Sequence, residues 1–128
     1  VESVLAGGDA DPRVAKDRFA LGRLSPLLAA GTYRFAEPPA DAKIAALAFA
    51  LGTYSFTRYR KSDPNKVSLE VPPGLDGEDL SRIVEGVFLA RDLINTPAND
   101  MGPAELALAV QAVAERFEAS FSCIVGEE

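Results

Sequence analysis

The 128-residue sequence contains no histidine and no tryptophan, and it has one cysteine and one methionine. Without a second cysteine no intramolecular disulfide can form, and a free thiol is typical of a reducing compartment such as the cytosol. Without histidine, most hydrolytic zinc sites are excluded, because they depend on imidazole ligands. A nucleophilic thiolate at Cys123 would also lack a histidine base to activate it.

Long apolar stretches are missing as well. The most apolar segment, residues 44–51, is far shorter than the roughly 20 residues that span a bilayer. The acidic, glycine-rich opening of the chain lacks the basic start and apolar stretch of a secretory signal. We therefore predict no membrane partner and a cytoplasmic location for this chain.

Positive charge is scarce, since 13 Lys and Arg residues stand against 19 Asp and Glu residues and give a net charge of −6. This balance makes nucleic acid an unlikely partner, because binding to phosphates depends mainly on Lys and Arg. The one basic cluster lies among aromatic residues, an arrangement also found in proteins that bind single strands. We interpret this cluster as a solvated helix end and loop. It comprises Arg58, Arg60, Lys61 and Lys66, with Tyr54, Phe56 and Tyr59 nearby.

Four stretches of the sequence have the apolar or alternating pattern of strands. They are residues 1–6, 31–36, 66–71 and 121–125. In the last of these, Phe121, Cys123 and Val125 share one face, so we expect Cys123 to act as a small apolar core residue. Residues 19–28 fit neither the strand period nor the helix period.

Three helices are predicted from apolar periodicity and end signals. Asp41 is the expected N-cap of the first helix. The second begins near Glu78 and ends near Asn95, because Pro97 disfavours a helical residue before it. The third opens at Pro103, where a missing N–H costs nothing. The stripes expected to face the core are Ile44, Leu47, Ala48, Leu51 and Tyr54 in the first helix, Leu80, Ile83, Val84, Val87, Phe88 and Ile94 in the second, and Leu106, Val110, Val113 and Phe117 in the third.

The most specific feature of the sequence is the turn between the second and third helices. It contains Asn95, Pro97, Asn99, Asp100, Gly102 and Pro103. Short polar side chains in such a turn commonly bond to their own backbone, so we expect Asn95, Asn99 and Asp100 to cap the adjacent helices. The alternative is that these side chains contact a ligand or a metal ion.

Residues 90–103, which carry this turn, resemble the segment with which leucyl aminopeptidases (cytosol aminopeptidases) enter their catalytic domain. Residues 31–35 and 50–61 resemble the end of the amino-terminal domain in bacterial members of that family. The resemblance implies an α/β fold, a mixed sheet with flanking helices, within a two-domain aminopeptidase. Residues 1–74 would belong to the amino-terminal domain, 75–97 would form the connecting helix, and 98–128 would begin the catalytic domain.

The resemblance also implies a function for a longer parent protein. Members of the family hydrolyse amino-terminal, leucine-like residues from peptides, form hexamers, and use two divalent metal ions, Zn²⁺ or Mn²⁺, held by Asp, Glu and Lys. These metals polarise the scissile carbonyl and activate a bridging water, while a lysine stabilises the oxyanion.

The family's metal-binding segments lie downstream of the turn, beyond Glu128. We therefore predict that this chain is an internal fragment that carries no catalytic, cofactor-binding or metal-binding residue and is inactive alone. Its start at Val1, without an initiator methionine, is consistent with a fragment. The alternative is a non-catalytic α/β module for binding or oligomer assembly.

Overall fold

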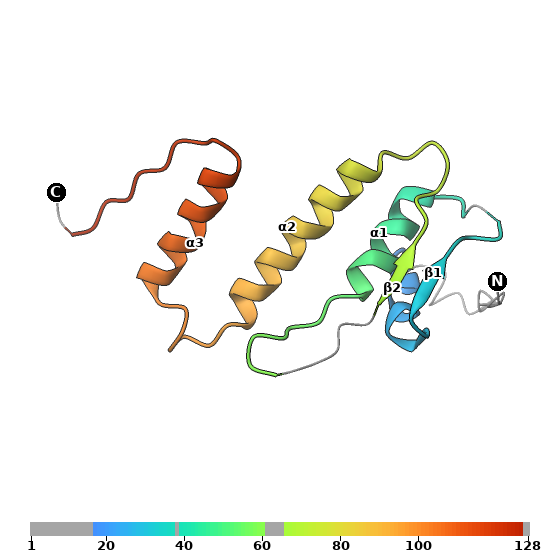
Figure 1. Cartoon of the computed structure of the whole chain (residues 1–128), viewed down its shortest axis with the longest axis horizontal. Coiled ribbons are helices and arrows are strands. Elements are labelled where there is room, and N and C mark those ends of the chain that lie inside the picture. The colour runs from blue at the N-terminus through green and yellow to red at the C-terminus, as the bar shows by residue number, and fades with distance from the viewer. Residues whose placement is uncertain (1–16, 38, 61–65, 127–128) are drawn as a thin grey trace. The chain divides into compact units, whose positions relative to one another are not determined.

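The computed structural model describes residues 17–37, 39–60 and 66–126 (Figure 1). The chain divides into two compact units, Val1–Phe88 and Leu89–Glu128. The elements, in chain order, are the 3₁₀ helices η1 (Ala20–Arg23) and η2 (Ser25–Leu27), strand β1 (Gly31–Tyr33), helix α1 (Ala42–Gly52), strand β2 (Val67–Leu69), and helices α2 (Gly77–Asn95) and α3 (Pro103–Arg116). The strand predicted at residues 1–6 lies outside the described residues.

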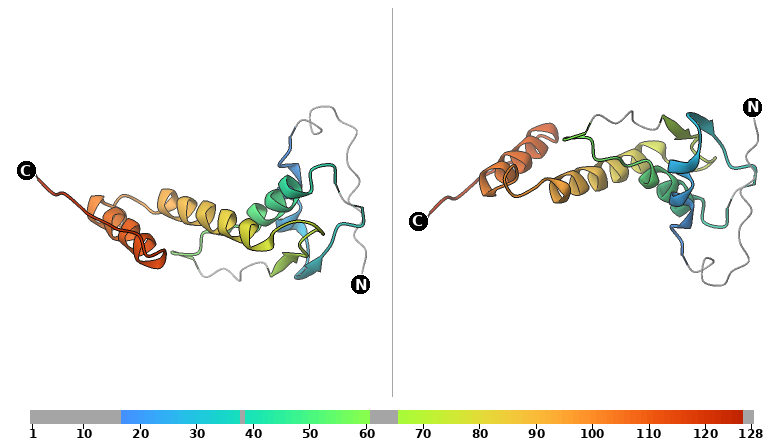
Figure 2. Two further views of the ribbon diagram at one scale, coloured as in Figure 1. Left: turned by 90° about the horizontal axis from the view of Figure 1, so that it is seen from above. Right: turned by 90° about the horizontal axis from the view of Figure 1, so that it is seen from below.

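The described strands form a parallel pair, which Figures 1 and 2 show side by side. Gly31 faces Val67 in the register, and Tyr33 faces Leu69. The Gly31 N–H donates to the Lys66 carbonyl at 3.0 Å, and the Glu70 N–H donates to the Tyr33 carbonyl at 2.8 Å. Helices together with a parallel sheet confirm the predicted α/β class. Both strands are shorter than the six residues predicted for each.

Helix α1 begins as predicted, because the Asp41 carboxylate accepts a hydrogen bond from the Ile44 N–H at 3.1 Å. Its predicted core stripe is only partly right. The buried residues are Ala45, Ala46, Ala48 and Phe49. Tyr54 lies beyond the end of the helix at Gly52 and packs against Phe88 with ring centroids 5.2 Å apart.

The residues that fitted neither period, 19–28, form the two short 3₁₀ helices, which pack closely on α1. A Cβ atom on Gly52 would lie 2.0 Å from the backbone oxygen of Gly22, and a Cβ on Gly22 would lie 2.6 Å from the Ala48 oxygen. The fully buried Ser25 hydroxyl donates to the Phe49 carbonyl at the same contact. This close approach explains why Ala48 and Gly52 are small, while Phe49 is the one large buried side chain of α1.

Helix α2 starts one residue before the predicted position and ends at Asn95 as predicted. The Asp76 carboxylate accepts from the N–H groups of Glu78 and Asp79 at 2.9 and 3.1 Å. This cap was not predicted, although an aspartate just before an amphipathic stretch is a usual signal for one. Of the predicted stripe, Leu80 is buried, while Ile83 and Ile94 are exposed.

In the second unit, Thr96 caps the C-terminal end of α2, and Glu105 caps the N-terminal end of α3. The buried Thr96 donates to the Asp92 carbonyl through both its hydroxyl, at 2.7 Å, and its N–H, at 3.0 Å. The Glu105 carboxylate reaches back to accept from the Gly102 N–H at 3.0 Å. Helix α3 begins at Pro103 as predicted, and the Glu105 carboxylate caps its first turn. The expectation that Asn95, Asn99 and Asp100 cap the adjacent helices stays a prediction.

The strand predicted at residues 121–125 is not formed, and Cys123 is exposed instead of being part of a core. A strand is held by backbone hydrogen bonds to a neighbouring strand. Within the part of the chain that the structure describes, β1 pairs only with β2, and no strand lies beside residues 121–125. An alternating pattern alone therefore does not produce a strand here.

The Glu105 cap gives a local prediction. We expect Glu105→Ala to destabilise α3 by about 0.5–1 kcal/mol, since it leaves a helix N-terminal amide without its partner. Amide hydrogen exchange at Gly102 should accelerate severalfold. Glu115→Ala, which removes only the 2.8 Å bond from Gln111 in the last turns of the helix, is the matched control and should leave the exchange at Gly102 unchanged. Unchanged exchange in Glu105→Ala would contradict this assignment of the cap.

Candidate functional site

The described residues do not assemble a metal centre. No group of three or more Asp, Glu, His or Cys side chains comes close enough to hold a metal ion in that part of the chain. Across the same residues, no helix is long and apolar enough to cross a membrane. The prediction that the chain carries no catalytic, cofactor-binding or metal-binding residue remains a prediction.

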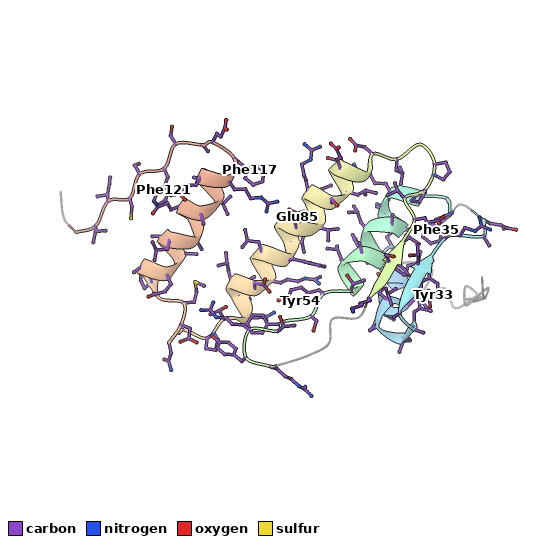
Figure 3. The ribbon with its side chains drawn as sticks, in the orientation of Figure 1. Tyr33, Phe35, Tyr54, Glu85, Phe117 and Phe121 are labelled. Atoms are coloured by element: carbon purple, nitrogen blue, oxygen red, sulfur yellow. The ribbon has the colours of Figure 1, made fainter. Side chains whose placement is uncertain are left out.

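The feature most suggestive of function is the apolar side chains that the second unit leaves exposed. The C-terminal apolar surface is the face of α3 that carries Leu106, Val110 and Phe117. Leu108 is also exposed but lies on another face of the helix, and the exposed Ile124 and Val125 lie in the segment that follows. Phe117 is 61% exposed and Val125 is 87% exposed, whereas Ala114 is the single buried residue of α3. Figure 3 shows Phe117 at the end of α3 and Phe121 in the segment that follows. Exposed apolar residues that share one helix face commonly mark a surface that another part of a protein covers.

Residues predicted to line one face of α3 contribute to this surface. Leu106, Val110 and Phe117 are exposed and Val113 is half-buried, although their spacing predicted a core-facing stripe. An amphipathic helix gains most of its stability when such a stripe is buried. The second unit does not itself bury this stripe. The stripe is therefore the best candidate for a contact with further polypeptide.

The first unit has an apolar hollow of about 460 Å³. Leu21, Leu24, Leu28, Tyr33, Phe35 and Phe49 supply its apolar lining, and Arg34 and Glu37 also border it. Figure 3 labels Tyr33 and Phe35, which come from β1 and the residues just after it. The hollow therefore lies between the sheet and the η1–η2 segment.

Charged side chains link α1 to the first turn of α2. The Lys43 Nζ lies 2.9 Å from one Asp79 carboxylate oxygen, and an Arg82 guanidinium nitrogen lies 3.5 Å from the other. The hydrogen bond and charge of Lys43 lower the pKa of Asp79, and Asp79 in turn raises the pKa of Lys43. At Asp41, the hydrogen bond from the Ile44 N–H and the nearby Arg18 lower the carboxyl pKa. These exposed pairs position helices and do not suggest catalysis.

The lowered carboxyl pKa values predict a loss of stability in acid. Asp41 and Asp79 have folded-state pKa values below the ordinary 3.8. Their contribution is therefore complete above about pH 4 and is lost as the pH falls through the folded-state values. The midpoint of urea unfolding should decrease between pH 6 and pH 3. The decrease should be smaller in Asp79→Asn, and Lys43→Met should reduce it similarly because it breaks the same pair. An equal decrease in all three proteins would refute this origin.

In the basic cluster, Arg58 and Arg60 lie in a loop beyond α1, since that helix ends at Gly52. The Arg58 guanidinium lies 5.8 Å from the centre of the Tyr59 ring, and the rings of Phe56 and Tyr59 are also 5.8 Å apart in an edge arrangement. Lys61 lies outside the described residues. Packing on the Tyr59 ring gives Arg58 a local structural role. The expectation that nucleic acid is not a partner remains a prediction.

Comparison with known proteins places the chain. Residues 1–72 match the family described as M17 aminopeptidase, N-terminal domain, which is more than half of the 128 residues. The chain therefore belongs to the M17 aminopeptidase family. This confirms the family resemblance found in residues 31–35, 50–61 and 90–103.

Individual relatives agree with this assignment. A probable cytosol aminopeptidase of Prochlorococcus marinus is 37% identical over 122 residues, covering 84% of this chain and 24% of the relative. A probable cytosol aminopeptidase of Nocardia farcinica is 39% identical over 88 residues, covering 59% of this chain and 18% of the relative. The crystal structure of the cytosol aminopeptidase of Coxiella burnetii is similar with a TM-score of 0.71 and 38% identity, over 80% of this chain and 23% of that one. The chain thus spans about a quarter or less of these relatives.

Proposed function

We propose that this chain forms part of the amino-terminal domain, and the entry to the catalytic domain, of a cytosol aminopeptidase that removes amino-terminal, leucine-like residues from peptides. One observation carries the proposal. The match to the Prochlorococcus marinus protein covers 84% of the chain, whereas the amino-terminal domain match stops at residue 72. The similarity to a single aminopeptidase therefore continues past the domain and through part of the region of α2 and α3.

The chemistry of the parent protein belongs outside the described residues. Its two metal ions, zinc or manganese, would need several carboxylate ligands, and the described residues offer no group of three acidic, histidine or cysteine side chains for one. These residues do not fit a metal centre, so we derive no catalytic step from them. Their proposed role is to build the first domain and to connect it with the catalytic part.

The C-terminal apolar surface gives the second unit a specific part in this proposal. We assign it to the contact with the remaining aminopeptidase polypeptide, which makes up about three-quarters of the Prochlorococcus marinus relative. Burying Val110 and Phe117 there would remove apolar surface from water and stabilise α3. The residues at 121–125 could then pair with a strand supplied by that polypeptide.

The wider expectations for the parent protein are part of the same proposal. We propose that it works in the cytoplasm and assembles as a homo-oligomer, a hexamer in the form implied by its family. We also propose that its partners are peptide substrates and that it engages neither nucleic acid nor membrane. The net charge of −6 supports the view on nucleic acid.

A chimera tests the proposed function. In it, the aligned segment of the Prochlorococcus marinus aminopeptidase is replaced by the corresponding residues of this chain, and release of leucine from leucine p-nitroanilide is measured with Mn²⁺ or Zn²⁺ and then with a chelator. We expect metal-dependent hydrolysis by the chimera and none by the isolated 128-residue chain. Metal-dependent hydrolysis by the isolated chain would place catalytic residues inside it and would contradict the proposal.

A pair of substitutions in the chimera tests the assigned contact. Val110→Asp would place a carboxylate in the buried contact, where an unpaired charge is costly. We expect it to abolish activity or soluble assembly of the chimera. Gln111→Asp introduces the same side chain at the adjacent exposed residue, where it loses only the hydrogen bond to Glu115, and should retain activity. Equal behaviour of the two variants would contradict the assigned contact.

The alternative function, a non-catalytic module for binding or assembly, predicts a different outcome. A chimera that folds and assembles like the relative but hydrolyses no substrate would favour it. The exposed apolar side chains of α3 are compatible with either function, so activity of the folded chimera is the deciding measurement.

A further inference from the structure

We draw no further inference here: the strongest candidate, the apolar hollow between the β1–β2 sheet and the η1–η2 segment, carries nothing because no feature of the described residues shows what covers it.

Discussion

Replacing Gly52 with alanine is expected to destabilise the first unit by about 3 kcal/mol or more, at the upper end of the usual cost of overpacking. The added Cβ would lie 2.0 Å from the backbone oxygen of Gly22 and 2.8 Å from the Ser25 hydroxyl oxygen. Rotation of a side chain cannot relieve the first contact, because the oxygen belongs to the backbone. The η1–η2 segment would have to move away from α1, and the buried bond between Ser25 and the Phe49 carbonyl would be lost with it.

Urea unfolding followed by far-ultraviolet circular dichroism measures this effect. At a slope of about 1 kcal/mol per molar urea, the midpoint should decrease by about 3 M or the variant should be unfolded without urea. Gly86→Ala is the matched control. A Cβ at Gly86 meets no atom within 4 Å, and alanine in the interior of a helix is favoured over glycine by about 0.5–1 kcal/mol. The control should therefore be as stable as the parent chain or slightly more stable. A Gly52→Ala variant with an unchanged midpoint would refute the close approach of η1–η2 to α1.

Phe49→Ala is expected to cost about 3–5 kcal/mol, the usual range for removing a buried aromatic side chain. Phe49 is 4% exposed and is the largest residue on the buried face of α1. Its side chain also borders the apolar hollow beside Leu24 and Leu69. Since the other buried residues of α1 are alanines, little side-chain volume is available to fill the space that Phe49 would leave.

The same urea measurement decides this prediction. Phe19→Ala makes the identical substitution at a side chain that is 52% exposed and should change the free energy of unfolding by less than about 1 kcal/mol. A cost in Phe49→Ala no larger than in Phe19→Ala would show that α1 does not anchor the core of the first unit. A cost limited to about 1 kcal/mol would indicate that neighbouring side chains collapse into the space.

Helix boundaries were the part of the fold best predicted from sequence. The Asp41 cap, the end of α2 at Asn95 and the start of α3 at Pro103 all depend on residues within one or two turns of each boundary. Such signals act through hydrogen bonds between near neighbours and are therefore visible in a local stretch of sequence. The bond from the Gly102 N–H to Glu105 was not predicted, although a glutamate at the third helical position can reach back to the N-cap amide.

Burial was predicted less well, because it depends on contacts between distant residues. The predicted stripe through Ile44, Leu47 and Leu51 is half-buried, whereas Ala45, Ala48 and Phe49 on α1 are buried. Helix α1 packs on η1 and η2. The sequence of α1 contains no pattern from which the contact between Gly22 and Gly52 could be predicted. The two glycines permit close backbone contact only after the 3₁₀ helices have packed against α1.

In the candidate site, too, local sequence features were predicted and burial was not. The family was predicted from residues 31–35, 50–61 and 90–103, and the match to the M17 amino-terminal domain confirmed it. That the stripe of α3 and residues 121–125 would be exposed was not predicted, since their patterns are those of buried elements. A periodic pattern indicates which side chains are suited to burial, but it does not indicate which polypeptide segment covers them.

By itself, the sequence determined the absence of imidazole groups and of an intramolecular disulfide. It also determined the positions of the α-helices in the described residues, the turn at residues 95–103 and the family to which the chain belongs. Only the tertiary structure decided which face of α1 is buried, that Gly22, Ser25 and Gly52 form one contact, and that residues 121–125 pair with no strand among the described residues. The physical reason is the separation in sequence between the interacting residues. Caps, turns and helical periods arise between residues a few positions apart, whereas burial and strand pairing require partners brought together from distant parts of the polypeptide.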